Sequence, residues 1–171
     1  LNYDVGLVNH LLRVIGIAGP PWLGSSQWAI PSIILITLWS GMGGSRMVIF
    51  LAALQGVPEE LYEAADIDGA GRLAKFLHIT LPMISPTMLF NLVLGIIGAL
   101  QVFTTAYITT KGGPARATWF FALHIFTNAF EYFDMGYASA LAWLMFIIIL
   151  AFSIVQIRTS DLWVFYSGEA R

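Results

Sequence analysis

Acidic side chains are the first candidates for chemistry in this chain, because half of its ten Asp and Glu residues lie in one polar segment, residues 59–82. Clustered carboxylates can bind a divalent metal ion or act as general acid and base. Two of them, Asp66 and Asp68, stand only two positions apart, and such positions do not share a helix face. Because no further carboxylate cluster supplies more ligands, the sequence predicts no metal site, and a metal-dependent membrane enzyme remains only a rival hypothesis. The acidic residues of the segment are Glu59, Glu60, Glu63, Asp66 and Asp68.

The other reactive residue types are no better placed for catalysis. His10, His78 and His124 lie far apart and lack the spacing of metal ligands. There is no cysteine, no Gly-x-x-x-x-Gly-Lys-Ser/Thr string for binding nucleotide phosphates, and no serine in a Gly-x-Ser-x-Gly elbow. We therefore expect no catalytic residue and no cofactor bound by this chain.

The composition is typical of a membrane protein. Hydrophobic residues make up 58% of the chain and charged residues 11%, and the mean hydropathy is +0.78. A soluble domain carries about 25% charged residues. The net charge of −2 gives no basic surface for nucleic acid. Leu1 is not followed by a basic stretch and a cleavage site, so we expect no signal peptide.

Three apolar runs are long enough to cross a bilayer as helices, at about residues 31–54, 85–110 and 136–157. The first would be about 36 Å long. In the second, Ser85 is expected to cap the helix and Pro86 to occupy its first position. Residues 1–23 suit a short interfacial helix, with Asn9 on its polar side, and residues 118–130 a re-entrant or interfacial helix. The sequence thus predicts an all-α bundle with three spans.

The polar segment between the first two runs reads as two short helices joined by a glycine. Pro58 suits the first turn, and the acidic residues after it place negative charge at the positive end of the helix dipole. Gly69 can adopt the left-handed conformation that ends the first helix. The second helix begins near Ala70, and we expect Pro82 to stop it.

Small and polar residues in two of the runs are candidates for a solute path. Asn91, Gly95, Gly98, Val102 and Thr105 recur at helical spacing in the second run, and the middle of the first run is rich in glycine. Arg46 lies in that middle, where an unpaired charge is costly, so we expect it to face protein or water. The pattern fits either a helix-packing seam or a solute path. The candidate path residues are Gly41, Gly44, Ser45, Asn91, Gly95, Gly98, Gln101 and Thr105.

The distribution of basic residues gives only weak evidence on orientation. With three spans, the polar segment and the tail lie on one side, with Arg72, Lys75, Arg158 and Arg171. The first segment and residues 111–135 lie on the other side, with Arg13, Lys111 and Arg116. The excess of one basic residue favours a cytoplasmic polar segment.

The polar segment resembles the EAA loop of permease subunits of binding-protein-dependent ABC importers. The residues that carry this resemblance are Glu63, Ala64, Ala65, Asp68, Gly69, Ala70, Phe76, Ile79, Leu81 and Pro82. Further strings at residues 6–9, 50–55, 110–114 and 136–140 resemble carbohydrate-type permeases, most closely the maltose-permease F-like subunit. The glycine-rich stretch 43–46 departs from that pattern.

The resemblance implies a polytopic MetI-like permease fold, of which the whole chain, residues 1–171, would be the carboxy-terminal part with about three of six core spans. It implies an importer for a sugar or related polyol in a bacterial or archaeal cell membrane. The loop, residues 57–82, would be a cytoplasmic coupling helix docked on an ATP-binding-cassette ATPase dimer, which binds ATP and Mg²⁺. A second permease subunit and an extracytoplasmic solute-binding protein would complete the assembly. A secondary transporter or channel subunit is the alternative from another class.

Overall fold

The structure, a computed structural model, describes residue 3, residues 6–42 and residues 44–166 of the chain, apart from the side chains of residues 42 and 45. Every regular element in these residues is a helix, which confirms the predicted all-α class. The chain divides into two compact units, Leu1–Gly41 with Gly98–Ile147 and Met42–Ile97 with Ile148–Arg171. The two long helices α6 (Leu81–Leu100) and α9 (Met135–Ser160) each contribute to both units.

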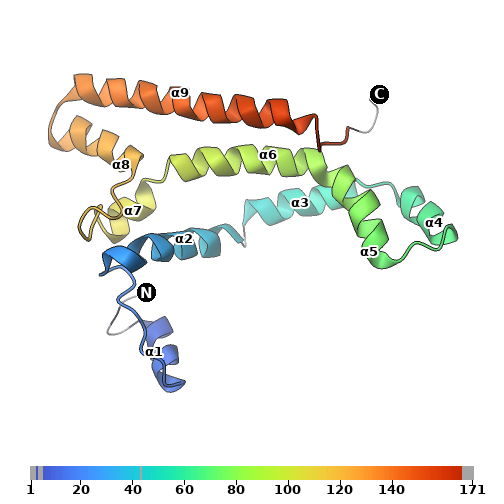
Figure 1. Ribbon diagram of the computed structural model, residues 1–171, viewed down its shortest axis with the longest axis horizontal. Helices are drawn as coiled ribbons and strands as arrows, with labels where there is room; N and C mark the ends of the chain where they lie inside the picture. The colour runs from blue at the N-terminus through green and yellow to red at the C-terminus, as the bar shows by residue number, and fades with distance from the viewer. Residues whose placement is uncertain (1–2, 4–5, 43, 167–171) are drawn as a thin grey trace. The chain divides into compact units, whose positions relative to one another are not determined.

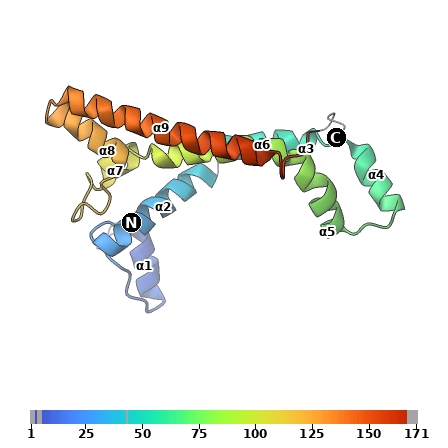
Figure 2. The ribbon, with the colours of Figure 1, turned by 45° about the horizontal axis from the view of Figure 1, so that its top comes forward.

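The first unit has a small apolar core. It contains α1 (Leu7–Val14), most of α2 (Ser26–Met42), α7 (Thr104–Thr109), α8 (Phe121–Phe126) and the π-helix η2 (Thr127–Glu131). Ile33, Ala106 and Leu123 form the core and are each at most 2% exposed. Aromatic rings close over it: Phe103 stacks on Tyr107 with 5.3 Å between the ring centroids. As a result, α7 and α8 lie side by side in both views, joined by the loop of residues 110–120 (Figures 1 and 2).

The amino-terminal helix of this unit is fixed by a polar residue. Asn9 is expected on the polar side of an interfacial helix, but it is only 1% exposed. The reason is that its Oδ1 accepts a hydrogen bond of 2.6 Å from the Trp22 indole, and its amide donates to the Pro20 carbonyl at 3.3 Å. The expectation for Asn9 is therefore wrong, because its side-chain amide hydrogen-bonds to the loop that leads from α1 to α2.

The second unit contains α3 (Ser45–Gln55), α4 (Glu59–Ile67), α5 (Arg72–Lys75), the π-helix η1 (Phe76–Thr80) and most of α6. Helices α4 and α5 are joined by a short turn and are seen clearly in both views (Figures 1 and 2). The helix that starts at Arg72 continues through η1 into α6 without interruption. This unit therefore holds the whole polar segment.

The two prolines of this helix do not end or start it, contrary to the expectation. Pro82 lies inside the first turn of α6, and Pro86 and Ser85 lie in the helix interior. A proline cannot donate to the carbonyl four residues earlier, and its ring crowds that carbonyl. In η1 the wider turn changes the pairing, because the Leu81 N–H bonds to the Phe76 carbonyl five residues back. We infer that this wider turn accommodates Pro82 within a continuous helix.

Two helical stretches of the described residues are long and apolar enough to cross a membrane, Arg72–Thr109 and Met135–Ser160. A third is obtained if the pair Ser26–Gly41 and Arg46–Gln55 is counted as one broken span. Only 6% of the apolar window in each of the first two is buried within the described chain, so their side chains are free to meet lipid or other helices. The membrane position of the three spans stays a prediction.

Candidate functional site

The polar segment forms a helical hairpin whose joint is built on a left-handed glycine. Gly69 has φ of +75°, as its position after an acidic helix predicts. The Ala70 N–H bonds to the Ala65 carbonyl at 2.8 Å, and the Gly69 N–H bonds to the Asp66 carbonyl at 3.0 Å. This pair of bonds is a Schellman motif, which satisfies carbonyls that the end of α4 would otherwise leave open. The chain then turns through Gly71 into α5.

An ion pair closes the hairpin across this joint. The Lys75 ammonium on α5 contacts the Asp66 carboxylate near the end of α4. The Lys75 side chain is 19% exposed, so this pair is partly shielded from water, whereas Asp66 is 65% exposed. Asp66 is therefore used to hold two helices together. No group of three or more potential metal ligands occurs in the described part of the chain.

A second contact ties α4 to the helix that leads into α6. The Tyr62 hydroxyl lies 2.8 Å from the Thr80 hydroxyl, and Thr80 is only 9% exposed. Because Tyr62 stands in the middle of α4 and Thr80 in the last position of η1, this bond connects both arms of the hairpin near their open end. Together with the joint and the ion pair, it holds the hairpin at three points.

The beginning of α6 is linked in turn to the segment after α9. Ser85 is 3% exposed, and its hydroxyl donates to the Pro82 carbonyl at 2.6 Å. The same oxygen accepts a hydrogen bond of 2.8 Å from the Phe165 N–H. Ser85 was expected to cap a helix, and that expectation is wrong because its hydroxyl joins two distant parts of the second unit.

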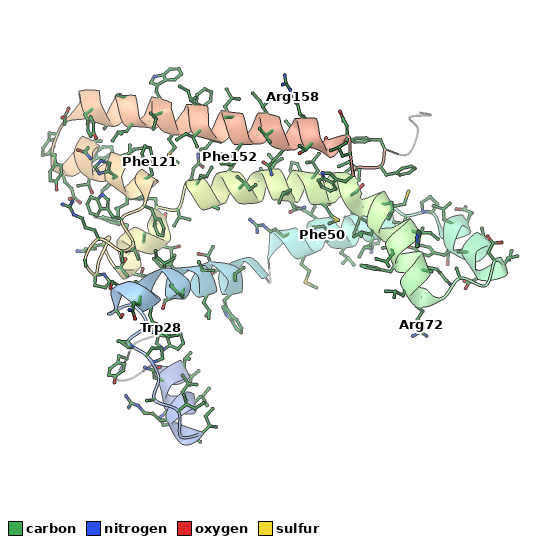
Figure 3. The ribbon with its side chains drawn as sticks, in the orientation of Figure 1. Trp28, Phe50, Arg72, Phe121, Phe152 and Arg158 are labelled. Atoms are coloured by element: carbon green, nitrogen blue, oxygen red, sulfur yellow. The ribbon has the colours of Figure 1, made fainter. Side chains whose placement is uncertain are left out.

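The hairpin exposes large apolar side chains although it is the most acidic part of the chain. Ile67 is 88% exposed and Leu73 is 71% exposed, and the two flank the glycine joint. Arg72 lies between them in sequence and points away from both helices (Figure 3). Contiguous exposed apolar side chains rimmed by charges mark surfaces that bind another protein. The remaining exposed apolar residues of the hairpin are Leu61, Phe76 and Leu77.

The residues predicted for coupling come together in one unit. All ten lie between α4 and the first turn of α6. Glu63, Ala64, Asp68, Gly69 and Phe76 are exposed, whereas the other members are partly covered. The partly covered members are Ala65, Ala70, Ile79, Leu81 and Pro82. The hairpin thus presents one set of these residues outward and uses the other for its own packing.

The residues predicted for a solute path do not form a single stripe. Helix α6 ends at Leu100 and α7 begins at Thr104, because Phe103 leaves the helical course to pack on Tyr107 and Phe126. Helical spacing therefore does not carry over to Gln101, Val102 and Thr105, and the expectation of one continuous face is wrong. Gly41, Gly98, Gln101 and Thr105 belong to the first unit, and Gly44, Ser45, Asn91 and Gly95 to the second.

The glycines predicted for the solute path have free space around them. No described atom outside the local helix lies within 4 Å of a Cβ built on Gly41, Gly44, Gly95 or Gly98. A tight seam between helices of the described chain is therefore not what these glycines serve. Asn91 donates to the Thr87 carbonyl at 2.9 Å, and Arg46 is exposed in the first turn of α3. Two roles stay predictions for these residues: packing against helices outside the described chain, and lining a solute path.

The sequence reasoning missed the contacts that fasten the hairpin. Lys75 stands nine positions after Asp66, and Tyr62 stands 18 positions before Thr80. The opposite charges and the intervening glycine were a usable signal for the first pair, since a hairpin brings such positions together. Nothing in the sequence pointed to the bond between Ser85 and Phe165, which are 80 positions apart.

The sequence matches, over residues 6–161, the family described as binding-protein-dependent transport system inner membrane component. Among curated relatives it is 42% identical over 167 residues to a probable ABC transporter permease protein, YesP, of Bacillus subtilis, covering 96% of this chain and 53% of the relative. It is 40% identical to the sulfoquinovosyl glycerol transport system permease protein SmoG of Agrobacterium fabrum, covering 92% and 51%. The trehalose/maltose transport system permease protein MalF of Thermococcus litoralis is 38% identical, with 92% and 52% covered. The chain therefore spans about half the length of these relatives.

Solved structures agree with the fold. A chain of a bacterial alginate ABC transporter, in complex with an alginate pentasaccharide-bound periplasmic protein, superposes with a TM-score of 0.81 at 26% sequence identity. The match covers 92% of this chain and 55% of that one.

Proposed function

The chain belongs to the family of binding-protein-dependent transport system inner membrane components, and we propose that it forms part of the translocation path of an ATP-driven sugar importer. The single observation that carries this proposal is the acidic hairpin, which is held at three points and exposes Ile67 and Leu73 at its tip. Exposed apolar side chains rimmed by charges are typical of surfaces that bind another protein. We propose that the partner is an ATP-binding-cassette ATPase dimer.

The hairpin would transmit movement of the ATPase into the membrane. A ligand shifts a conformational equilibrium only through contacts that differ between the two states. Closure of the ATPase dimer would displace the hairpin as one body, because the ion pair of Asp66 with Lys75 and the bond of Tyr62 with Thr80 fix its two arms. The displacement would reach α6 through the continuous helix from Arg72, and the segment after α9 through Ser85.

The chemistry of the importer would be divided among several chains. ATP and Mg²⁺ would bind to the ATPase, since this sequence has no phosphate-binding string. A second permease subunit would complete the path, and a solute-binding protein would deliver the solute on the outer side. A sugar or polyol is the proposed solute, supported by relatives that are named for trehalose and maltose or for sulfoquinovosyl glycerol.

Two single cysteines test the docking and the orientation, and the chain's 171 residues contain no cysteine of their own. The importer is assembled from the full-length permease with its proposed partners, an ATPase and a second permease subunit. Ile67→Cys, at the hairpin tip, is expected to cross-link to the ATPase. Ala115→Cys, on the loop after α7, is expected to react with an impermeant maleimide from the outer side only and to give no such cross-link.

The opposite results would refute the proposal. If Ile67→Cys reacts with the impermeant reagent from outside, the hairpin does not face the ATPase and the orientation is reversed. If Ile67→Cys is labelled from the inner side but never cross-links to the ATPase, the tip of the hairpin is not the surface that docks on the ATPase, and the proposed coupling role of the hairpin fails.

A further inference from the structure

Helix α1 carries an apolar face that the described residues of the first unit leave exposed. Leu7, Leu11 and Val14 recur on one side of the helix, and their side chains are 74%, 57% and 72% exposed. Two exposed isoleucines, Ile15 and Ile17, follow directly after the helix. Neighbouring apolar side chains that stay exposed in this way mark a surface that binds a partner. We call Leu7, Leu11 and Val14 the apolar face of α1.

The opposite side of α1 is clamped to the loop that follows the helix, so the apolar face cannot turn inwards. Asn9 lies on that opposite side, since successive residues of a helix are about 100° apart. Its Oδ1 accepts a hydrogen bond of 2.6 Å from the Trp22 indole, and its amide donates to the Pro20 carbonyl at 3.3 Å. Gly19 gives the clamp its space, because a Cβ built there would lie only 2.5 Å from the Asn9 Cγ. We call these contacts the Asn9 clamp.

The direction of α1 suits a position along a membrane surface. Both α1 and α2 belong to the first unit, and α1 runs across the direction of α2 in both views (Figures 1 and 2). Because α2 is the first part of a candidate membrane span, a helix that crosses its direction runs along the bilayer surface. Trp22 and Trp28 meet near the start of α2 with 5.5 Å between their ring centroids, and Trp28 lies on the side of α2 where α1 is found (Figure 3). Tryptophan rings are enriched at the headgroup level of a bilayer.

The charge of this segment suits lipid headgroups. The exposed residues His10 and Arg13 lie on the polar side of α1, and the sequence has no acidic residue between Asp4 and Glu59. A helix with basic residues on one side and aliphatic residues on the other lies in the plane of the membrane interface. We propose that the apolar face of α1 docks on the lipid bilayer, and that the Asn9 clamp holds α1 there as an in-plane anchor at the end of the first span.

This anchor goes beyond the proposed function, because it involves neither the ATPase nor the solute. The sequence alone predicts an interfacial helix within residues 1–23, and the structure adds the face that meets the lipid and the clamp that orients it. With α1 fixed in this way, the adjoining end of α2 would stay at the level of the headgroups.

Nitroxide labels at two neighbouring positions test the docking. The full-length importer, free of other cysteines and of its solute-binding protein, is labelled at Leu11→Cys or at His10→Cys and placed in nanodiscs of phosphatidylglycerol and phosphatidylethanolamine. Electron paramagnetic resonance then compares the access of oxygen, which concentrates in lipid, with that of a nickel chelate, which stays in water. We expect oxygen to reach the label at position 11 more readily, and the nickel chelate to reach the label at position 10 more readily.

Two glycines of the loop after α1 provide a matched test of the Asn9 clamp. The methyl group of Gly19→Ala would displace the Asn9 amide, whereas the Cβ of Gly24→Ala would meet its nearest atom, the Pro21 Cβ, at an ordinary 3.7 Å. We expect Gly19→Ala to shift the equilibrium of α1 about fivefold from the docked towards a released form, since a hydrogen bond of the clamp is lost. Gly24→Ala should leave it unchanged. The readout is the mobile fraction of the spectrum of the label at Leu11→Cys.

Three outcomes would overturn the anchor. If the nickel chelate reaches the label at Leu11→Cys more readily than oxygen does, the apolar face is not on the bilayer. If the label is shielded from both reagents, or becomes shielded only when the solute-binding protein is added, a protein covers the face instead of lipid. Equal spectra of Gly19→Ala and Gly24→Ala would show that the Asn9 clamp does not hold the helix. The proposed function fails separately, in the cross-linking experiment, because these measurements require no contact with the ATPase.

Discussion

The joint of the hairpin gives the sharpest prediction, because two of its glycines, Gly69 and Gly71, differ in backbone conformation. Gly69 has φ of +75°, whereas Gly71 has φ of −70° and ψ of 165°. No described atom outside the local helix lies within 4 Å of a Cβ built on either residue, so a new side chain meets no steric obstacle at either position. Valine at position 69 would be held in a left-handed conformation at a cost of about 1–3 kcal/mol. Valine at position 71 would adopt an extended conformation that any residue tolerates.

The strain at position 69 should appear as a loss of coupling. A cost of about 1–3 kcal/mol corresponds to a 5- to 150-fold shift of a two-state equilibrium, here between the folded hairpin joint and alternatives that release it. The Gly69→Val and Gly71→Val variants are reconstituted with their partners, and ATP-dependent uptake of the sugar carried by the binding protein is measured. We expect Gly69→Val to lose most uptake while inserting normally, and Gly71→Val to retain it. Equal uptake by the two variants would show that the left-handed joint is not needed for coupling.

Two further predictions concern the bond at the open end of the hairpin and the predicted path. Tyr62→Phe and Thr80→Val each remove one partner of the 2.8 Å bond, worth about 1 kcal/mol, and should each lower uptake about fivefold. The double variant should lose no more uptake than either single variant, because both remove the same bond. Additive losses of uptake would show that the two hydroxyls act separately. Gly98→Leu should block uptake while leaving the cross-link from Ile67→Cys intact; normal uptake would exclude Gly98 from the path.

The left-handed joint and the family were predictable because the signals are local. Only glycine adopts a positive φ without cost, so a glycine directly after an acidic helix specifies the turn by itself. The family followed from about twenty consecutive positions around it, and the match over residues 6–161 confirms it. The all-helical class followed from composition and from the length of the apolar runs.

The rest required knowledge of tertiary contacts. Proline at position 82 normally ends a helix, but the π-helical turn before it removes that constraint, and this turn has no strong sequence signal. The prediction that Asn91 and Thr105 share one helix face requires a continuous helix between them. In the structure α6 ends at Leu100, where Phe103 packs on the rings of Tyr107 and Phe126. In both places packing overrides local propensity, and the spacing of residues cannot reveal it.

The continuity of the helix at Pro82 changes what the hairpin can do. If the helix stopped there, α5 and α6 would be joined by a flexible link, and a displacement of the hairpin would be absorbed before it reached the membrane. The Leu81 N–H instead bonds to the Phe76 carbonyl, so the backbone stays helical from Arg72 to Leu100. The bond of Tyr62 with Thr80 then joins α4 to this same helix just before α6 begins. A force applied at the exposed tip of the hairpin thus reaches the apolar helix α6 by two routes, one covalent and one through a buried hydroxyl.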